Sequence, residues 1–161
     1  MLTGDPPCVN LVPVDDSQDW RLATAVLRLA TQLVDGIQAG VADRGFTDVR
    51  PAHGFAFVRI AEGPTSVADL AAHLGTSKQA ASQLVAQLVA RGYVTRHEDP
   101  TDGRAQLLAL TARGRDCTTA ARQAAVGTVQ GWRRGLPADE ADRLVAALDA
   151  MTEPGPLRPA W

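Results

Sequence analysis

The fold of this chain is decided by residues 66–110, which have the sequence SVADLAAHLGTSKQAASQLVAQLVARGYVTRHEDPTDGRAQLLAL. Residues 66–74 begin with a serine that can cap a helix, and Gly75 ends that helix. A second helix is expected from Thr76–Arg91, and Gly92 ends it. Two short helices joined by so tight a turn predict a helix-turn-helix.

The residues that follow the second helix predict a β-hairpin. Residues 93–97 (YVTRH) alternate in polarity and are rich in residues that favour strands. Residues 98–103 (EDPTDG) have the composition of a turn, with Pro100 at the second position of a type I turn, and residues 104–110 form the return strand. A helix-turn-helix followed by such a hairpin is an arrangement that binds duplex DNA.

Long helices with apolar faces are predicted on both sides of this segment. The first begins near Asp16 or Ser17, either of which can cap it, and ends near Arg44. After the hairpin, Thr111 can cap a second long helix, which ends before Pro137, and a last helix follows. The apolar positions on these three helices are Trp20, Ala23, Leu27, Ala30, Val34, Ile37 and Val41 with Leu22, Val26, Leu29 and Leu33; then Cys117, Ala121, Ala125, Val129 and Trp132; then Ala141, Leu144, Val145, Leu148 and Met151.

The predicted fold class is mainly α with a small β-hairpin wing, a winged helix-turn-helix with long dimerisation helices. A short helix from Arg50-Pro51 to Gly63-Pro64 connects the first long helix to the helix-turn-helix. The glycine pairs Gly36/Gly40 and Gly127/Gly131 mark either a close helix–helix contact at a dimer interface or a loosened helix. The expected regions are a flexible arm over 1–15, a helical dimerisation region over 16–48 and 112–152, the winged helix-turn-helix over 50–111 and a flexible tail over 153–161.

Composition and charge narrow the class of protein. The hydrophobic fraction of 45% excludes wholesale disorder. The net charge of −2 is unevenly distributed, because residues 50–115 hold eight basic and five acidic side chains and the remainder of the chain is acidic. The sequence contains neither a signal-peptide pattern nor an apolar run long enough to span a membrane. We therefore expect a cytoplasmic protein whose basic charge surrounds the predicted DNA-binding segment.

The second predicted helix has a core-facing and a polar face. The residues spaced for burial are Ala81, Leu84, Val85 and Leu88. Amide and hydroxyl groups on the opposite face match the paired donors and acceptors of base edges, and Lys78 can reach a guanine or a phosphate. The alternative is an ordinary solvated helix face. The candidate DNA-contacting residues of this face are Lys78, Gln79, Ser82 and Gln83.

Further candidates for DNA contact lie at the helix start and on the wing. Thr76 and Ser77 stand where free backbone N–H groups and the helix dipole favour a phosphate. Arg104 is placed to enter a minor groove, where narrow A·T-rich stretches concentrate negative potential. Asp102 can hold that guanidinium by a charge-assisted hydrogen bond, unless the two form only a surface ion pair. Arg96, on the first strand of the wing, completes the set.

Cysteine and histidine give no sign of a metal site, a cofactor or an enzyme. Cys8 and Cys117 are too few for a disulfide framework, and Cys117 is expected to be a small buried hydrophobe in preference to a redox sensor. His53, His73 and His97 fall on separate elements without a closely spaced ligand set. Surface or cleft histidines are expected, with His53 a candidate for lining a ligand cleft. No catalytic triad, phosphate loop or paired-acid motif occurs.

The strings that shape the predicted DNA-binding segment resemble the MarR family of transcriptional regulators. The resemblance is dense over residues 50–115, and the flanking helices agree in order and length. Two departures are Gln83, where the family often has arginine, and Gly103, where it has another basic residue. Cys8 precedes the first helix, so the role of the family's peroxide-sensing cysteine is not carried over. The strings are Gly63-Pro64 with Ala68–Gly75, Ser77–Val85, Arg91-Gly92-Tyr93-Val94, Asp99-Pro100-x-Asp102-x-Arg104 and Leu110-Thr111-x-x-Gly114.

This resemblance implies a triangular homodimer whose first and last helices, around 17–44 and 112–151, interlock. Two such subunits would bind the two half-sites of a pseudo-palindromic operator in double-stranded DNA. The resemblance also implies repression that is relieved when a small, often aromatic ligand binds between the dimerisation region and the DNA-binding segment. The alternative is a winged-helix module that binds protein without binding DNA, which the missing cations favour; an enzyme is not expected. The expected dimer contacts are Trp20, Val26, Leu27, Trp132, Leu144 and Leu148.

Overall fold

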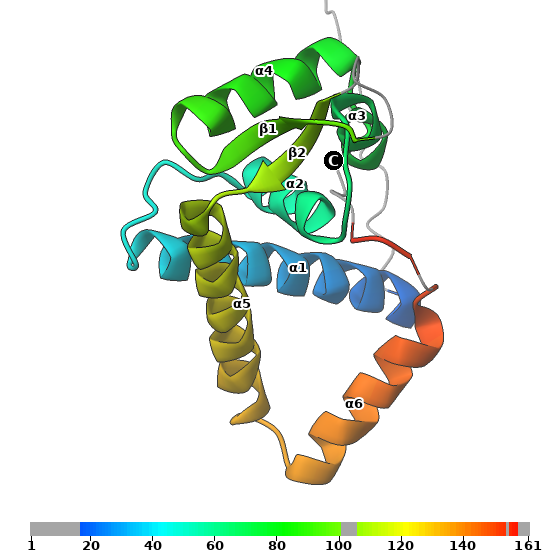
Figure 1. Cartoon of the computed structure of the whole chain (residues 1–161). Helices are drawn as coiled ribbons and strands as arrows, with labels where there is room; N and C mark the ends of the chain where they lie inside the picture. The colour runs from blue at the N-terminus through cyan, green and yellow to red at the C-terminus, as the bar shows by residue number, and fades with distance from the viewer. Residues whose placement is uncertain (1–16, 101–105, 154, 158–161) are drawn as a thin grey trace, which may run out of the picture. The chain divides into compact units, whose positions relative to one another are not determined.

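The described residues form helices and one antiparallel hairpin in the order expected for a winged helix-turn-helix (Figure 1). The computed structural model describes residues 17–100, 106–153 and 155–157. It divides into two compact units, residues 1–32 and 33–161, and the division falls within the first helix. The element bounds are α1 Gln18–Ala42, α2 Pro51–Ala61, α3 Val67–Leu74, α4 Lys78–Ala90, β1 Val94–Glu98, β2 Gln106–Leu110, α5 Ala112–Arg133 and α6 Ala138–Met151.

The described part of the first unit is the N-terminal portion of α1. The backbone N–H of Trp20 donates to Oγ of Ser17 at 3.2 Å, so Ser17 caps the helix as predicted. Large apolar side chains on this portion face solvent in the single chain: Trp20 is 48% exposed and Leu27 is 66% exposed. Such a face is costly to leave in water, and the other exposed apolar residues here are Leu22, Val26 and Leu29.

The core of the second unit is enclosed by the helix-turn-helix, α2 and the hairpin. In Figure 1, α4 lies beside β1 and α2 lies beside β2, which agrees with the contacts between these elements. Leu108 of β2 is almost fully buried between them. The larger buried side chains of this core are Val41, Val49, Phe57, Ile60, Leu70, Val85, Leu88, Tyr93, Val94, Leu108 and Cys117.

Local signals fix the ends of α3. The hydroxyl of Ser66 accepts from the backbone N–H of Asp69 at 3.2 Å, and the carboxylate of Asp69 accepts from the backbone N–H of Ser66 at 2.9 Å. This reciprocal capping confirms the predicted capping box. Gly75 ends α3 in the left-handed region, at φ 62° and ψ 33°, which a residue with a Cβ rarely adopts.

The hairpin has the predicted order with slightly shifted ends. Val94 lies opposite Leu110 and Glu98 lies opposite Gln106. On its other side, β2 contacts Thr65, whose carbonyl accepts from the backbone N–H of Leu108 at 2.8 Å. The first strand begins one residue later than predicted, and residues 101–105 of the predicted turn and return strand lie outside the described residues.

The first glycine pair allows close packing between two helices of the same chain. A Cβ on Gly36 would overlap the side chain of Thr128, and a Cβ on Gly40 would overlap that of Ala124. Within the second unit, α1 therefore approaches α5 more closely than larger residues would permit. The second pair has no such role here, since a Cβ on Gly127 would meet nothing within 4 Å.

The contact with α1 adds buried positions beside the predicted apolar residues of α5. Those predicted residues are Cys117, Ala121, Ala125, Val129 and Trp132. Cys117 is buried, Ala121, Ala125 and Trp132 are half-buried, and Val129 is 37% exposed. Ala120 and Ala124 are also buried, and the small side chain of Ala124 packs against Gly40. A sequence pattern could not indicate which side of α5 meets α1.

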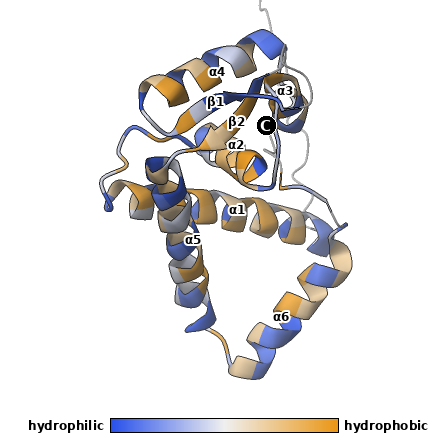
Figure 2. Cartoon of the chain, viewed as in Figure 1, coloured by the Kyte–Doolittle hydropathy of each residue, from blue (hydrophilic) through white to orange (hydrophobic). Residues whose placement is uncertain are grey.

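The apolar side chains of α6 remain largely exposed in the single chain. Figure 2 shows hydrophobic residues along this helix. Pro137 lies at the N-cap of this helix. Of the predicted apolar face only Ala141 is buried. The rest of that face is exposed, with Leu144 at 45%, Val145 at 46%, Leu148 at 41% and Met151 at 64%. Within the described ranges, no helix is both long and apolar enough to cross a membrane.

Gly114 joins the first turn of α5 to the base of the hairpin. A Cβ at this position would overlap the carbonyl oxygen of Tyr93, whose position is fixed by the backbone N–H of Thr111 at 3.0 Å. The hydroxyl of Thr111 also accepts from the backbone N–H of Gly114 at 3.1 Å, which caps α5.

We expect Gly114→Ala to lower the free energy of unfolding by about 1–3 kcal/mol, because the overlap can be relieved only by moving backbone. The matched control is Gly127→Ala in the same helix. It adds the same methyl group in open space and should be neutral or stabilising by up to about 1 kcal/mol. Urea unfolding followed by circular dichroism measures both. Equal stability of the two variants would contradict the close contact at Gly114.

Candidate nucleic-acid interface and cavity

The structure orients α4 as predicted. Ala81, Val85 and Leu88 are fully buried, while Leu84 is half-buried. The opposite side of the helix faces solvent. We call this the outer face of α4, and it consists of the exposed Lys78, Gln79 and Gln83 with the half-buried Ser82.

The start of α4 carries free backbone donors. Ser77 caps the helix, because its Oγ accepts from the backbone N–H of Ala80 at 3.2 Å. Thr76 and Ser77 are both exposed and precede the helix that was predicted to begin with them. The first N–H groups of a helix have no partner within it, so this end presents donors and the positive end of the helix dipole to solvent.

The wing is described in part. Arg96 is exposed on β1 and lies opposite Leu108 of β2. Asp102 and Arg104 lie outside the described residues, so their predicted ion pair stays a prediction. At the turn end of β1, Glu98 is also exposed, and this acidic group offsets part of the positive charge near Arg96.

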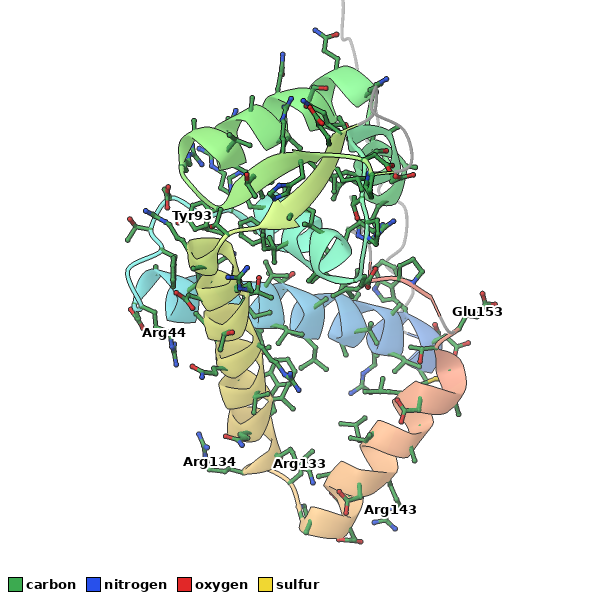
Figure 3. All side chains as sticks on the ribbon, in the orientation of Figure 1. Arg44, Tyr93, Arg133, Arg134, Arg143 and Glu153 are labelled. Carbon is green, nitrogen blue, oxygen red and sulfur yellow. The ribbon has the colours of Figure 1, made fainter. Side chains whose placement is uncertain are left out.

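A cluster that sequence analysis missed fixes the junction between the hairpin and α5, where Figure 3 labels Tyr93. Tyr93 is fully buried, and its hydroxyl donates to Oδ1 of Asp48 at 2.6 Å. Arg113 donates to the same hydroxyl oxygen at 3.0 Å, with its guanidinium carbon 4.5 Å from the ring centroid. The rings of Phe46 and Phe57 lie 6.3 and 5.6 Å from the ring of Tyr93. The tyrosine thus has both hydrogen-bonding and aromatic partners.

Asp48 connects this cluster to the end of α4. Arg91, the C-cap of α4, donates from Nη1 to the carbonyl oxygen of Asp48 at 2.9 Å, and its Nε lies 3.8 Å from the carboxylate. The hydrogen bond from Tyr93 is the main reason that the pKa of Asp48 is lowered, and the nearby Arg113 and Arg91 lower it further. We call Asp48, Arg91, Tyr93 and Arg113 the Tyr93 cluster.

The histidine prediction was wrong for two of the three residues. His53 and His73 are each only 5% exposed, whereas His97 is exposed as expected. Nδ1 of His53 accepts from the backbone N–H of Arg50 at 3.1 Å, and burial lowers the pKa of this imidazole. Its side chain supports the start of α2 and is absent from the lining of the cavity described below. Nε2 of His73 has no hydrogen-bond partner among the described residues.

Cys117 behaves as the sequence predicted. It is only 1% exposed, and burial raises the pKa of its thiol to about 11. A thiol in this state is unreactive near neutral pH. Cys8 lies outside the described residues. In the part of the chain that the structure describes, no three His, Cys, Asp or Glu side chains gather as a metal-binding group.

An apolar cavity of about 370 Å³ lies within the second unit. It is lined by the C-terminal portion of α1, by α2 and by α5, together with Leu157 of the tail. Its size falls in the range of small-molecule sites. Among its lining residues are Val34, Ile37, Phe55, Phe57, Ala121 and Ala125.

Comparison with known proteins relates this arrangement to one family. Residues 47–105 match the model of the MarR family. None of the curated proteins compared with the chain matches it. The crystal structure of RV1404 from Mycobacterium tuberculosis is 28% identical, with a TM-score of 0.73, over 89% of this chain and 98% of its own.

Two further solved structures share the fold. Wild-type MarR from E. coli in its apo form is 20% identical, with a TM-score of 0.67, over 82% of this chain and 97% of its own. A mutant of MepR from S. aureus, bound to an oligodeoxyribonucleotide, is 16% identical, with a TM-score of 0.62, over 81% of this chain and 94% of its own. Each of these two solved structures is matched over nearly its whole length.

The Tyr93 cluster gives a pH-dependent prediction. At neutral pH, Tyr93→Phe should lower the free energy of unfolding by about 1.5–3 kcal/mol, because it removes a hydrogen bond to a charged group. The pKa of Asp48 is depressed in the folded state, so its contribution is present above its ordinary pKa of about 3.9 and is lost as the pH falls through the folded value. The difference between wild type and Tyr93→Phe should therefore shrink below about pH 4.

Urea unfolding at neutral and acid pH measures this difference. Asp48→Asn serves as the control, because it keeps an acceptor near Tyr93 but cannot titrate. Its stability relative to Tyr93→Phe should change with pH much less than that of wild type does. A wild-type advantage that stays constant from neutral pH to pH 3 would contradict the role given to the charged carboxylate.

Proposed function

We propose that this chain, which belongs to the MarR family, is a cytoplasmic dimeric repressor of transcription that binds a pseudo-palindromic operator in double-stranded DNA. A small-molecule ligand releases it. The observation that carries the proposal is the outer face of α4, which presents lysine, amide and hydroxyl groups to solvent from a helix whose other side is anchored in the core. Groups of these types recognise base edges and phosphates in the major groove.

We assign the contacts to DNA bases to the outer face of α4. The contacts to the DNA phosphates are assigned to the N-terminus of α4 and the residues just before it. Gln79 and Gln83 are suited to pair with an adenine edge, and Lys78 with guanine or phosphate. The N-terminus of α4 and the hydroxyls of Thr76 and Ser77 suit a phosphate. Among the structural relatives, the MepR mutant bound to an oligodeoxyribonucleotide supports binding of DNA by this fold.

The exposed apolar faces of α1 and α6 support a dimer. Leu144 and Leu148 are 45% and 41% exposed on one side of α6, while Trp20 and Leu27 are exposed on α1. Exposed apolar surface on this scale is typical of a site that a partner covers. A two-fold dimer presents two copies of α4, which matches a pseudo-palindromic operator. Trp132 is only half-buried and Val26 is exposed, so each is available to contact a partner.

The apolar cavity is the proposed ligand site. It lies between helices assigned to the dimerisation region and α2 of the DNA-binding segment, which is where the family resemblance places a ligand. Phe57 lines the cavity and also contacts the ring of Tyr93. A ligand there would touch Phe57, which packs against the cluster that holds the end of α4, and release requires that the ligand bind the DNA-free arrangement more tightly.

A footprint of the purified chain on its own upstream DNA tests the proposal. We expect two symmetric protected half-sites, separated centre to centre by about one helical turn of DNA or a multiple of it. Affinity should fall as the salt concentration rises, because bound phosphates release counterions. Failure of a folded dimer to bind any promoter fragment at low salt would contradict the proposal and favour a module that binds protein.

Paired variants of the outer face sharpen the same experiment. Lys78→Gln should weaken binding to all sequences and reduce the slope of log affinity against log salt by about 1. Gln83→Ala should leave that slope unchanged and relax sequence preference at one position. Arg104→Glu should weaken binding, and unchanged affinity would argue against a contact by the wing.

The dimer has a separate test. Leu148→Asp places a charge on the exposed apolar face of α6 and should convert a species of twice the 17.0 kDa chain mass into one of 17.0 kDa. Val89→Asp is the control, since Val89 is similarly exposed at 38% but lies on α4. Sedimentation equilibrium measures both. A dimer that survives Leu148→Asp and Leu144→Asp would place the interface elsewhere.

A further inference from the structure

The lining of the cavity restricts the charge of the molecule that it can hold. The polar side chains in its lining are Gln38, Thr118 and Arg122. The hydroxyl of Thr118 already donates to the carbonyl oxygen of Gly114 at 2.9 Å, so its proton is used within α5. Gln38 is half-buried, whereas Arg122 is exposed. Within the described lining, Arg122 is therefore the sole charged group, and it lies at the solvent side.

An anionic ligand fits this distribution poorly. A carboxylate inside the cavity would lose its water shell among carbon atoms, and that loss is expensive without several hydrogen bonds. An ion pair with an exposed arginine contributes little binding free energy, because solvent screens such a pair. A carboxylate could instead stay in water beside Arg122. In that case only the uncharged remainder of the ligand would occupy the apolar interior.

A neutral ligand faces no such penalty. The aromatic and aliphatic side chains of Phe55, Phe57 and Val58 from α2 meet those of Ile37 and Ala121 from the two long helices. Burial of apolar surface against them is favourable in proportion to its area. Gln38 supplies one amide, which can donate to or accept from a single polar group on the ligand.

We propose that the cavity takes an uncharged, predominantly apolar molecule with few hydrogen-bonding groups, one of which Gln38 contacts. The inference rests on the proposed function only in assigning a ligand to this cavity; the chemistry of that ligand comes from the lining. It distinguishes a neutral aromatic or aliphatic molecule from an aromatic acid.

Gly54 offers a means of closing the cavity. It lies on α2 and lines the cavity, and a Cβ added there would meet nothing within 4 Å. We expect Gly54→Leu to place a side chain in the cavity, whereas Gly54→Ala adds one methyl group in open space and leaves most of the cavity free. Both variants keep the helical backbone of α2.

The test uses the full chain without DNA and two probes of the same shape, the methyl ester of naphthoic acid and the free naphthoate anion. Equilibrium dialysis measures their dissociation constants. We expect the ester to bind at least about tenfold more tightly than the anion. Gly54→Leu should weaken ester binding by at least about tenfold, and Gly54→Ala by less than about threefold. Arg122→Gln should leave both constants unchanged within about twofold.

Two results would overturn the inference. The first is a naphthoate anion that binds as tightly as the ester and loses that affinity in Arg122→Gln, which would make Arg122 the counter-ion of an acid. The second is ester binding that Gly54→Leu does not weaken, which would place the probe on another apolar surface. A footprint with Gly54→Leu separates these results from the proposed function, since DNA binding by that variant should persist whatever the probes show.

Discussion

The hydrogen bond between Tyr93 and Asp48 is the constraint on which the arrangement of the second unit depends. The phenol is fully buried, so its hydroxyl needs partners, and Asp48 and Arg113 supply them at 2.6 and 3.0 Å. Asp48 also holds Arg91 at the end of α4. One buried side chain thus ties together the loop before α2, the end of α4, the start of β1 and the first turn of α5. Only the phenol is buried, since the side chains of Asp48 and Arg113 are 37% and 50% exposed. The arrangement is specified because a buried hydroxyl without these partners would be costly.

Helix α4 is held in place by its buried side. The side chains of its outer face can therefore vary without loss of core packing. Val85 and Leu88 hold the helix in the core, and Arg91 fixes its end, so none of the outer-face side chains is needed for packing. That face carries one lysine and two glutamines. Cations supply most of the sequence-independent attraction to phosphate, whereas amides distinguish bases. If this face contacts DNA as proposed, its composition favours selectivity over general affinity.

Local signals in the sequence predicted the elements, but not the contacts that assemble them. Ser66 with Asp69, Gly75 and Thr111 act within a few residues, so the helix ends and the outer face of α4 could be predicted. The hydrogen bond between Asp48 and Tyr93 joins residues 45 positions apart, so no periodic pattern in the sequence indicates it. The burial of Ala124 on α5 is set by its contact with Gly40 of α1, and His53 is buried on the side of α2 that packs into the core. Such features depend on how elements meet, which short-range patterns do not encode.

Phe57 is the side chain that the core and the cavity share. Its ring lies 5.6 Å from that of Tyr93, and another part of it lines the cavity. A molecule in the cavity would therefore be separated from the Tyr93 cluster by a single side chain. Close-packed cores transmit small shifts because they have few voids to absorb them. A bound molecule changes affinity for DNA only if it favours one arrangement of α4 over another. The hydrogen bond from Tyr93 to Asp48 is the interaction through which such a preference would reach α4, because the same aspartate holds Arg91 at the end of that helix.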